Sequence, residues 1–452
     1  MQVVLISTYE LGRQPFGLAS PAAWLRSRGH AVVCVDTSRQ RLALESVAEA
    51  GLVAFYLPMH TATRLAVPLI RRILKARPEA HVCCYGLYAP MNEPYLRALG
   101  VKTILGGEFE QGLADLAAGA GGTPPLISLE RLRFVTPDRS QLPALSSYAT
   151  LHFEGAKRNV GSTEASRGCK YLCRHCPVVP VYNGTFRIVQ RDVVLADIRQ
   201  QVAMGAEHIT FGDPDFFNGP GHAMAIVDAL HAEFPALTYD ATIKIEHLLK
   251  HRDLLPRLKA TGCLFIISAV ESLNDQILAL LDKGHTRTDF IQAVRLTRDA
   301  GLTLTPTFVT FTPWTTLDDF RELLEALAEL DLVENVAPIQ LAIRLLIPAG
   351  SRLLELPEMR EKLGEFDSSA LSYQWRHDDP AVDRLCSEIQ LLIQTEERRK
   401  SSRRAIFGRI WELAHDRPLP AAFHLESSAA VPHLSEPWYC CAEPTSEQLA
   451  QI

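Results

Sequence analysis

The sequence predicts an α/β protein: a flavodoxin-like (Rossmann-like) domain, a linker, a partial (β/α)6 TIM-like barrel and a helical C-terminal extension. The predicted bounds are 1–120, 121–160, 161–355 and 356–452. Short apolar runs alternate with helical patterns in the first part, and the alternation restarts with longer helices in the third. The stretch between them opens with Gly-Gly-Thr-Pro-Pro, and turn residues at that density indicate a boundary.

Five apolar runs in the first part have the length and composition of parallel strands that are covered on both faces. They are Val3–Ile6, Ala31–Val35, Leu52–Leu57, His81–Tyr85 and Thr103–Leu105. Helical patterns lie between them, so we expect a doubly wound sheet whose ligand lies beyond the carboxyl ends of the strands. Cysteines 34, 83 and 84 fall inside these strands, and we expect them to be buried thiols.

The third part shows six strand–helix units. The predicted strands are Ser162–Ser166, His208–Phe211, Thr238–Ile243, Leu264–Ala269, Thr303–Phe311 and Ile339–Leu346. The predicted helices between them include Leu248–Thr261 and Thr316–Leu330, the second with Thr315 or Thr316 as its cap. In such a barrel the chemistry lies at the carboxyl ends of the strands.

Composition excludes several classes of protein. The net charge of −6 argues against a nucleic-acid or anionic-membrane partner, and no apolar run is long enough to span a bilayer. The N-terminus reads as a strand rather than a signal peptide. Ten cysteines in a chain of 452 residues favour metal-binding or catalytic thiols over a disulfide framework, so we expect a cytoplasmic protein.

One loop carries the strongest chemical signal. Cys169, Cys173 and Cys176 follow one another at Cys-x3-Cys-x2-Cys spacing, with no fourth cysteine nearby. Thiolates suit zinc or iron–sulfur clusters. A structural zinc site needs four protein ligands, and His175 would have to be the fourth although it adjoins Cys176. A [4Fe–4S] cluster on three cysteines leaves one iron open to a substrate or cosubstrate.

This loop resembles the signature of the radical S-adenosylmethionine (radical SAM) superfamily. The resemblance implies a [4Fe–4S] cluster on the three cysteines and SAM at the open iron, where one electron breaks a carbon–sulfur bond. It also implies an electron donor such as flavodoxin or ferredoxin. His175 holds the position that is usually aromatic in the family, and its ring would pack beside the adenine.

The resemblance implies further SAM contacts at the strand ends. Gly212, Asp213 and Pro214 loosely match the segment that receives the methionine amino group, although the acid is shorter and Asp215 reads as a turn cap. Ser268 and Glu271 end the fourth strand, and Glu271 is the preferred ribose or SAM ligand. Arg344, in the sixth strand, is predicted either to hold the SAM carboxylate or a substrate anion, or to form a structural ion pair.

The first part resembles the cobalamin-binding domain that precedes many radical SAM barrels, and Gly106-Gly107-Glu108-Phe109-Glu110 fits that resemblance. The loop after the first strand lacks Asp-x-His-x-x-Gly, so no histidine would ligate cobalt. The sequence leaves open whether cobalamin binds or whether the domain kept only its packing.

The end of the chain, Cys440-Cys441-Ala442-Glu443-Pro444, resembles the tail of a group of radical SAM proteins in which the second position is either cysteine or selenocysteine. The resemblance implies that Cys441 is a reactive thiol and Cys440 its neighbour. Vicinal thiols suit arsenic or selenium, which suggests a metalloid substrate.

The sequence therefore predicts an enzyme that cleaves SAM reductively and modifies a small-molecule or metalloid substrate held by the C-terminal cysteines. One alternative is a cobalamin-dependent radical SAM methyltransferase. The other is a non-catalytic protein that binds a metal or metalloid.

Overall fold

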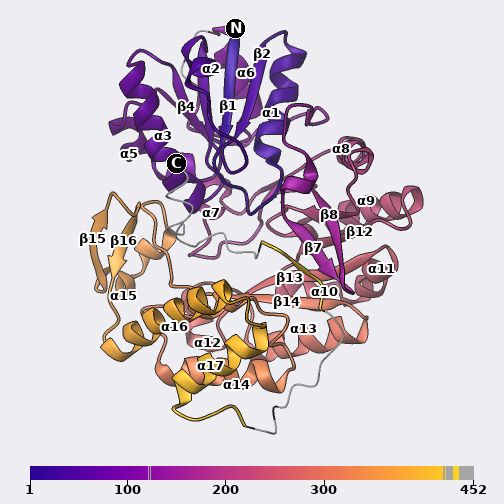
Figure 1. Cartoon of the computed structure of the whole chain (residues 1–452), viewed down its shortest axis with the longest axis vertical. Coiled ribbons are helices and arrows are strands. Elements are labelled where there is room, and N and C mark those ends of the chain that lie inside the picture. Colours follow the sequence, from indigo (N-terminus) through magenta and orange to yellow (C-terminus); the bar gives the residue numbers. More distant parts are fainter. Residues whose placement is uncertain (121, 123, 421–422, 424–430, 437–452) are drawn as a thin grey trace.

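The computed structural model describes residues 1–120, 122, 124–420, 423 and 431–436. An N-terminal α/β domain stands above a curved second sheet, and the C-terminal helices pack on the outside of that sheet (Figure 1). Cys440 and Cys441 lie outside the described residues.

The N-terminal sheet is parallel throughout, in the order β2-β1-β3-β4-β5-β6. Its strands are β1 (Gln2–Ser7), β2 (Ala31–Asp36), β3 (Leu52–Tyr56), β4 (Val82–Tyr85), β5 (Thr103–Gly107) and β6 (Ile127–Ser128). The first five match the predicted runs to within about two residues, and their order is the predicted flavodoxin-like one.

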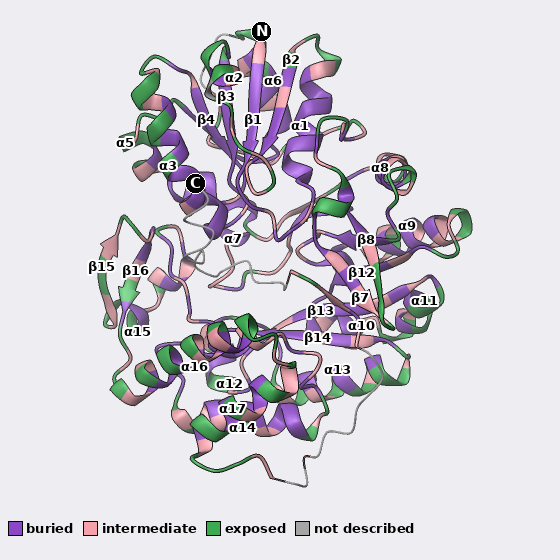
Figure 2. Ribbon diagram, viewed as in Figure 1, coloured by how far each residue is buried: buried purple, intermediate pink, exposed green. Residues whose placement is uncertain are grey.

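Helices cover both faces of this sheet, which explains why its strands are apolar except at their ends (Figure 2). They are α1 (Phe16–Ser27), α2 (Leu44–Ala48), α3 (His60–Ala76), α4 (Tyr88–Met91), α5 (Glu93–Ala98) and α6 (Glu110–Ala118). The α1 and α6 helices pack together on one face and α3 packs on the other. Cysteines 34, 83 and 84 are buried and free, as predicted.

The segment predicted as a linker contains more structure than its turn residues suggested. It holds η1 (Leu145–Ser147), β7 (Thr150–Phe153) and most of β8 (Ala156–Thr163), which form an antiparallel hairpin. The predicted strand Ser162–Ser166 is therefore wrong in its bounds. The exposed start of β8, with lysine, arginine and asparagine, lacks the apolar pattern by which a strand is recognised.

The second sheet has the order β14-β13-β12-β11-β8-β7-β17, in which five strands run parallel. Besides β8 these are β11 (His208–Phe211), β12 (Thr238–Thr242), β13 (Cys263–Glu271) and β14 (Thr303–Phe308). The predicted sixth strand Ile339–Leu346 is wrong: η4 (Pro338–Ala342) occupies its first half, and a single bridge joins Arg344 to Phe311. The side chain of Gln340 takes the hydrogen bond of Phe308 N–H that a strand backbone would accept.

Helices line the outer face of this half-barrel and short elements surround the cysteine loop. They are β9 (Ser166–Gly168), α7 (Val179–Tyr182), β10 (Phe186–Ile188), α8 (Arg191–Ala203), η2 (Phe216–Asn218), α9 (Pro220–Glu233), α10 (Ile245–Lys250), η3 (Arg252–Leu254), α11 (Leu255–Ala260), α12 (Asp275–Leu280), α13 (Arg287–Asp299) and α14 (Leu317–Glu329). The predicted helix Leu248–Thr261 is divided between α10 and α11. Thr316 caps α14 in a capping box with Asp319, which confirms one of the two predicted alternatives for this cap.

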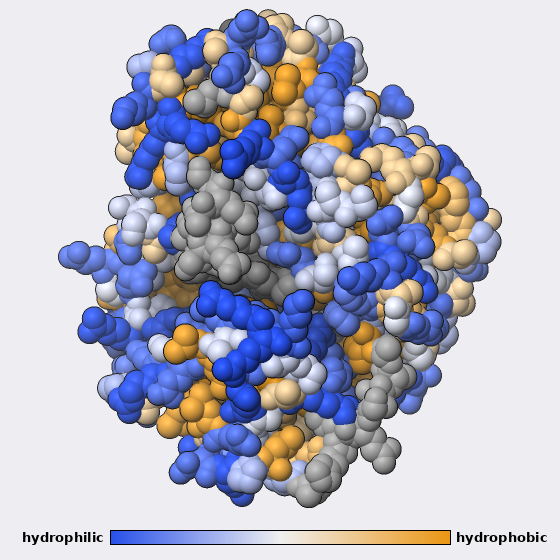
Figure 3. Space-filling view, viewed as in Figure 1, coloured by the Kyte–Doolittle hydropathy of each residue, from blue (hydrophilic) through white to orange (hydrophobic). Residues whose placement is uncertain are grey.

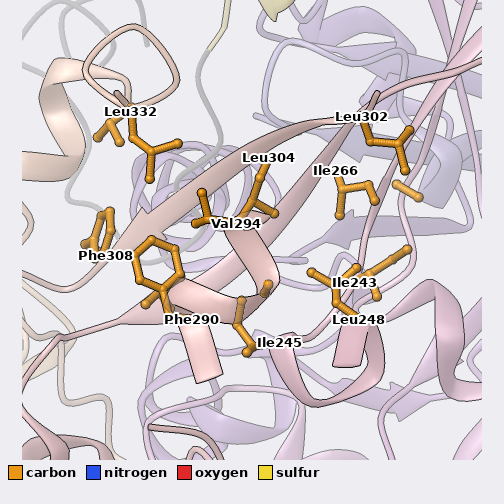
Figure 4. Close-up of a cluster of buried hydrophobic side chains, with 14 of the residues drawn as sticks. Ile243, Ile245, Leu248, Ile266, Phe290, Val294, Leu302, Leu304, Phe308 and Leu332 are labelled. Atoms are coloured by element: carbon orange, nitrogen blue, oxygen red, sulfur yellow. The ribbon is translucent and has the colours of Figure 1, made fainter. Parts of the chain in front are cut away.

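The main core of the half-barrel lies between the sheet and these helices. In Figure 4, Ile266 of β13 and Leu304 of β14 face Phe290 and Val294 of α13. These side chains are essentially inaccessible to solvent, so this layer forms the rigid base from which the strand ends project.

The C-terminal region continues with η5 (Arg352–Glu355), α15 (Pro357–Arg360), β15 (Leu363–Asp367), β16 (Ser372–Trp375), α16 (Pro380–Arg398), α17 (Arg403–His415) and β17 (His433–Leu434). The helix predicted over Asp383–Leu413 is two helices, because Lys400 adopts a left-handed conformation with φ of 58°. Strand β17 pairs with β7, so the chain returns to the half-barrel.

On the face shown in Figure 3, hydrophobic residues form separate patches among hydrophilic ones. No helix within the described part of the chain is long and apolar enough to cross a membrane.

Candidate active site between the two sheets

A cavity of about 290 Å³ lies between the N-terminal domain and the half-barrel. Both sheets direct the carboxyl ends of their strands toward it, which is where α/β folds of both kinds place their ligands. The upper wall comes from the loops after β1, β3, β4 and β5, and the lower wall comes from the cysteine loop and the ends of β11 to β14.

The upper wall is mainly apolar and aromatic. Its residues include Tyr56, Met59, Leu87, Tyr88 and Phe109. Glu10 and Arg13, from the loop after β1, add two ionisable groups. Burial and the neighbouring Glu164 raise the pKa of Glu10 well above its ordinary value. Among the described residues of this upper wall there is no histidine.

Cys169, Cys173 and Cys176 all line the lower wall, on the loop between β9 and α7. Gly168 starts the loop with φ of 76°, and a Cβ there would lie 2.4 Å from the Tyr182 ring and 2.6 Å from Thr185 O. Only glycine fits this turn without strain. The three cysteines that were predicted as ligands from their spacing therefore line the same wall of one cavity.

The three thiols suit a cluster better than a single metal ion. In the part of the chain that the structure describes, no three histidine, cysteine, aspartate or glutamate side chains converge on a point that could hold one ion. This geometry gives no support to a zinc site completed by His175. Three thiols around the end of one cavity suit a cluster, whose irons are separate atoms that each take one sulfur.

Cationic side chains lie close to these thiols. Burial and the nearby Asp215 together raise the pKa of Cys169 to about 11, although Lys244 opposes the shift. Lys283, which is buried, interacts electrostatically with both Cys173 and Cys176. At Cys169 burial outweighs the positive charge of Lys244, so the thiol keeps its proton until a metal centre binds it as a thiolate.

Glu271 connects the cysteine loop to the end of β13. Its carboxylate accepts hydrogen bonds from His175 Nε2 at 3.0 Å and from Lys283 Nζ at 3.3 Å. Despite its burial, the Lys283 and His175 partners hold the pKa of Glu271 near 2. Its φ of 71°, beside an irregularity in the β13–β14 pairing, costs roughly 1–3 kcal/mol, a cost typical of functional positions.

The predicted segment after β11 divides between two roles. Gly212 and Pro214 line the cavity, as does Asp215, which also caps η2 and contacts His247 Nδ1 at 2.6 Å. Asp213 does not line it. Its carboxylate instead accepts from Ala165 N at 2.9 Å and from Ser166 Oγ at 2.6 Å.

Ser268 and Arg344, predicted as cofactor contacts, also lie outside the cavity lining. Strand alternation puts Ser268 on the face of β13 that carries Ile266, toward the helices. The Arg344 guanidinium donates to Asp383 Oδ1 at 2.6 Å and to Trp375 O at 2.6 Å, and it stacks on the Trp375 ring. Arg344 therefore forms a structural ion pair, the second of the two roles predicted for it.

Lys244, Lys283 and Arg167 line the cavity without having been predicted as cofactor contacts. Lys244 follows β12, and its ammonium lies 3.8 Å from the centre of the Tyr171 ring and pairs with Glu246. A lysine at a strand end was a readable signal in the sequence. Lys283 carried no such signal, because long-range packing brings it to the cavity, and Arg167 adjoins the cysteine loop but has its partners Glu108 and Glu110 in the other domain.

Comparisons with known proteins agree with this geometry. Residues 163–327 match the family model described as the radical SAM superfamily. The hopanoid C-3 methylase of Methylococcus capsulatus is 24% identical over 325 residues, 67% of this chain and 62% of that protein. A bacteriochlorophyllide d C-12(1)-methyltransferase of Chlorobaculum tepidum is 28% identical over 133 residues, 29% of this chain and 28% of that protein. The chain spans less than two thirds of either relative.

Two solved structures have a similar fold. The cobalamin-dependent radical enzyme OxsB with aqua-cobalamin bound aligns with a TM-score of 0.64 at 15% identity, over 87% of this chain and 67% of that one. The radical SAM methyltransferase TsrM of Kitasatospora setae, with cobalamin and a [4Fe–4S] cluster, aligns with a TM-score of 0.57 at 18% identity, over 73% and 70%. The family match, which includes the cysteine loop, identifies residues 163–327 as a radical SAM domain.

Proposed function

We propose that this chain is a cobalamin-dependent radical SAM enzyme that transfers a methyl group to a small molecule. The main support is the cavity, which has three cysteine thiols on one wall and an aromatic sheet edge on the other. The relatives named above are methylases, and a cobalamin-dependent radical enzyme aligns with 87% of this chain. Methyl transfer, the first alternative drawn from the sequence, therefore becomes the leading proposal.

In this proposal Cys169, Cys173 and Cys176 hold a [4Fe–4S] cluster. The cluster, when reduced, supplies the electron that cleaves SAM. Lys244 and Lys283 provide positive charge for the SAM carboxylate, and Asp215 and Glu271 provide negative charge for its amino group and sulfonium. His175, held by Glu271, limits the space beside the last cysteine.

The upper wall would hold the corrinoid, which carries a methyl group as its chemistry. Tyr56, Tyr88 and Phe109 offer flat apolar surfaces at the ends of β3, β4 and β5. The absence of histidine among the described residues of this wall means that the cobalt would have no imidazole ligand from them. An external one-electron donor such as flavodoxin or ferredoxin completes the proposal. No disulfide joins the cysteines of the described part, as suits a protein of the cytoplasm.

A metalloid substrate is the second candidate, and one observation favours it. Tyr9 Oη donates to Glu436 Oε1 at 2.6 Å, and Tyr9 adjoins Glu10, which lines the cavity. Cys440 follows Glu436 by four residues, and an extended chain of that length spans at most roughly 14 Å. Chain length therefore permits the predicted thiols Cys440 and Cys441 to act at this cavity.

Anaerobic reconstitution with iron, sulfide and hydroxocobalamin tests the leading proposal. We expect about four irons and one corrinoid per chain after gel filtration, read by iron assay and visible absorbance. Reduction in the presence of SAM should then give 5′-deoxyadenosine, with S-adenosylhomocysteine from methyl transfer, measured by mass spectrometry. The Cys169→Ala variant is the control, because it should keep the corrinoid and lose the deoxyadenosine.

The outcomes separate the candidates. Deoxyadenosine without corrinoid binding would remove cobalamin from the proposal, and no SAM fragment at all would favour a non-catalytic metal- or metalloid-binding protein. Arsenite titration of the wild type and of a Cys440→Ala/Cys441→Ala variant tests the second candidate. Equal arsenite affinity would exclude the C-terminal thiols from metalloid binding.

A further inference from the structure

A single buried arginine joins the cysteine loop to the upper domain. Arg167 lies on β9, two residues before Cys169, and its guanidinium is surrounded by carboxylates from both domains. Glu108 and Glu110 come from the segment that follows β5, whereas Glu164 comes from the segment between β8 and β9.

The contacts use most of the donors that the guanidinium has. Its Nε donates to Glu164 Oε2 at 2.7 Å, and Nη1 donates to Glu108 Oε2 at 3.2 Å. Nη1 and Nη2 also form a bidentate pair with Glu110, at 2.9 and 2.6 Å. Tyr182 Oη donates to Glu108 at 3.0 Å. The guanidinium is therefore fixed in position and orientation.

This cluster is poorly balanced as a stabilising device. Three carboxylates face one guanidinium, and the side chains of Glu108 and Glu110 are fully buried. Burial raises the pKa of Glu108 to about 7 even though Arg167 opposes the shift. Buried ion clusters of this kind rarely exceed an apolar replacement in stability, so a positional role accounts for the cluster better than a stabilising one.

The cluster lies between the two halves of the cavity. Gly107 and Phe109, on either side of Glu108, line the upper wall, and Arg167, Gly168 and Cys169 line the lower wall. The Phe109 ring also lies 4.9 Å from the guanidinium carbon. A ligand that contacts Gly107 and Phe109 therefore fixes the same segment that holds the acceptors of Arg167.

We propose that Arg167 is a positioning residue that couples ligand binding on the upper wall to SAM binding at the cysteine loop. The inference rests on the proposed function, since it needs a corrinoid above and SAM below. A corrinoid that orders the segment after β5 would hold the acceptors of Arg167 and, through Gly168, the cysteine loop. By linkage, SAM then strengthens corrinoid binding by the same factor.

Arg139 supplies a matched control. It is also a buried arginine that joins the domains, donating to Asp197 at 2.8 and 2.9 Å and to Gln14 Oε1 at 2.9 Å. It does not line the cavity. A purely structural effect should therefore appear in Arg139→Lys as well as in Arg167→Lys, whereas a coupling role should appear only in the second.

The experiment measures the corrinoid dissociation constant of the reconstituted, full-length enzyme with and without saturating SAM. We expect SAM to tighten corrinoid binding at least about fivefold in the wild type and in Arg139→Lys. In Arg167→Lys the ratio of the corrinoid dissociation constants without and with SAM should fall to about one, and the iron content should be unchanged. Glu110→Gln, which keeps the shape of the acceptor and removes its charge, should lower the ratio too and serves if Arg167→Lys fails to fold.

Two results would overturn this inference and leave the proposed function intact. They are a ratio of one in the wild type, and equal ratios in the wild type and Arg167→Lys. A loss of coupling of the same size in Arg139→Lys would also refute it, because the effect would then be general loosening of the domain interface. If the wild type binds no corrinoid, the proposed function itself fails and the inference fails with it.

Discussion

Replacing Asp213 by asparagine separates a structural role for this carboxyl group from contact with SAM. Burial raises the pKa of Asp213 from 3.8 to about 7, although the hydrogen bonds from Ser166 and Ala165 oppose the shift. Since the folded-state pKa is the higher one, the folded state binds a proton more tightly than the unfolded state. The stability from this group is complete below about pH 4 and is lost as the pH rises through about 7.

The magnitude follows from the same two pKa values. Linkage predicts that the free energy of unfolding of the wild type falls by about 2 kcal/mol at most between about pH 5.5 and pH 8. Asparagine cannot ionise, and its amide can still accept from Ala165 N–H and donate to Ser166 Oγ. The free energy of unfolding of Asp213→Asn should therefore not show this fall.

Urea or thermal unfolding of both proteins at about pH 5.5 and about pH 8 gives the comparison, with SAM affinity measured alongside. We expect the asparagine variant to gain about 2 kcal/mol on the wild type across this range and to bind SAM normally. If the free energies of unfolding of the two proteins change with pH in parallel, the raised pKa of Asp213 is refuted. A tenfold loss of SAM affinity would show instead that the carboxylate contacts the cosubstrate, as the sequence motif predicts.

Three further substitutions test other parts of the molecule. Asp197→Ala leaves the Arg139 guanidinium buried without its carboxylate and should cost about 3–5 kcal/mol in urea unfolding, whereas a loss under 1 kcal/mol would mean that water replaces the carboxylate. Gly168→Ala places a Cβ 2.4 Å from the Tyr182 ring at a positive φ, so iron retention after gel filtration should fall well below that of the wild type; full retention would show that the loop can move. Cys176→Ser should abolish cluster absorbance while leaving the far-ultraviolet circular dichroism unchanged, and a normal cluster would remove Cys176 from the ligand set.

Local patterns were sufficient for most of the fold. The parallel strands of the first domain are apolar except for a few residues at their ends, so their runs stand out from the helices, and their order is the predicted one. The cap of α14 was also readable, because Thr316 and Asp319 have the spacing of a capping box. The cysteine loop needed only its spacing to be recognised.

Elements that depend on distant partners could not be read locally. Ile339–Leu346 has the composition of a buried strand, but Gln340 supplies a side-chain acceptor where a strand would supply backbone. Arg344 looked like a ligand because its partner, Asp383, lies 39 residues away. Arg167 adjoins the recognised loop, yet its role depends on Glu108 and Glu110 of the other domain.

The pairing of β17 with β7 has a consequence for how the molecule behaves in solution. An uncovered outer strand offers its backbone to neighbouring molecules and promotes aggregation. Here the chain's own later segment covers that rim: His433 and Leu434 pair with His152 and Leu151, and Leu434 adds an apolar contact. A protein shortened before His433 would present this margin to other copies, so expression trials should retain the final residues for the sake of solubility as well as chemistry.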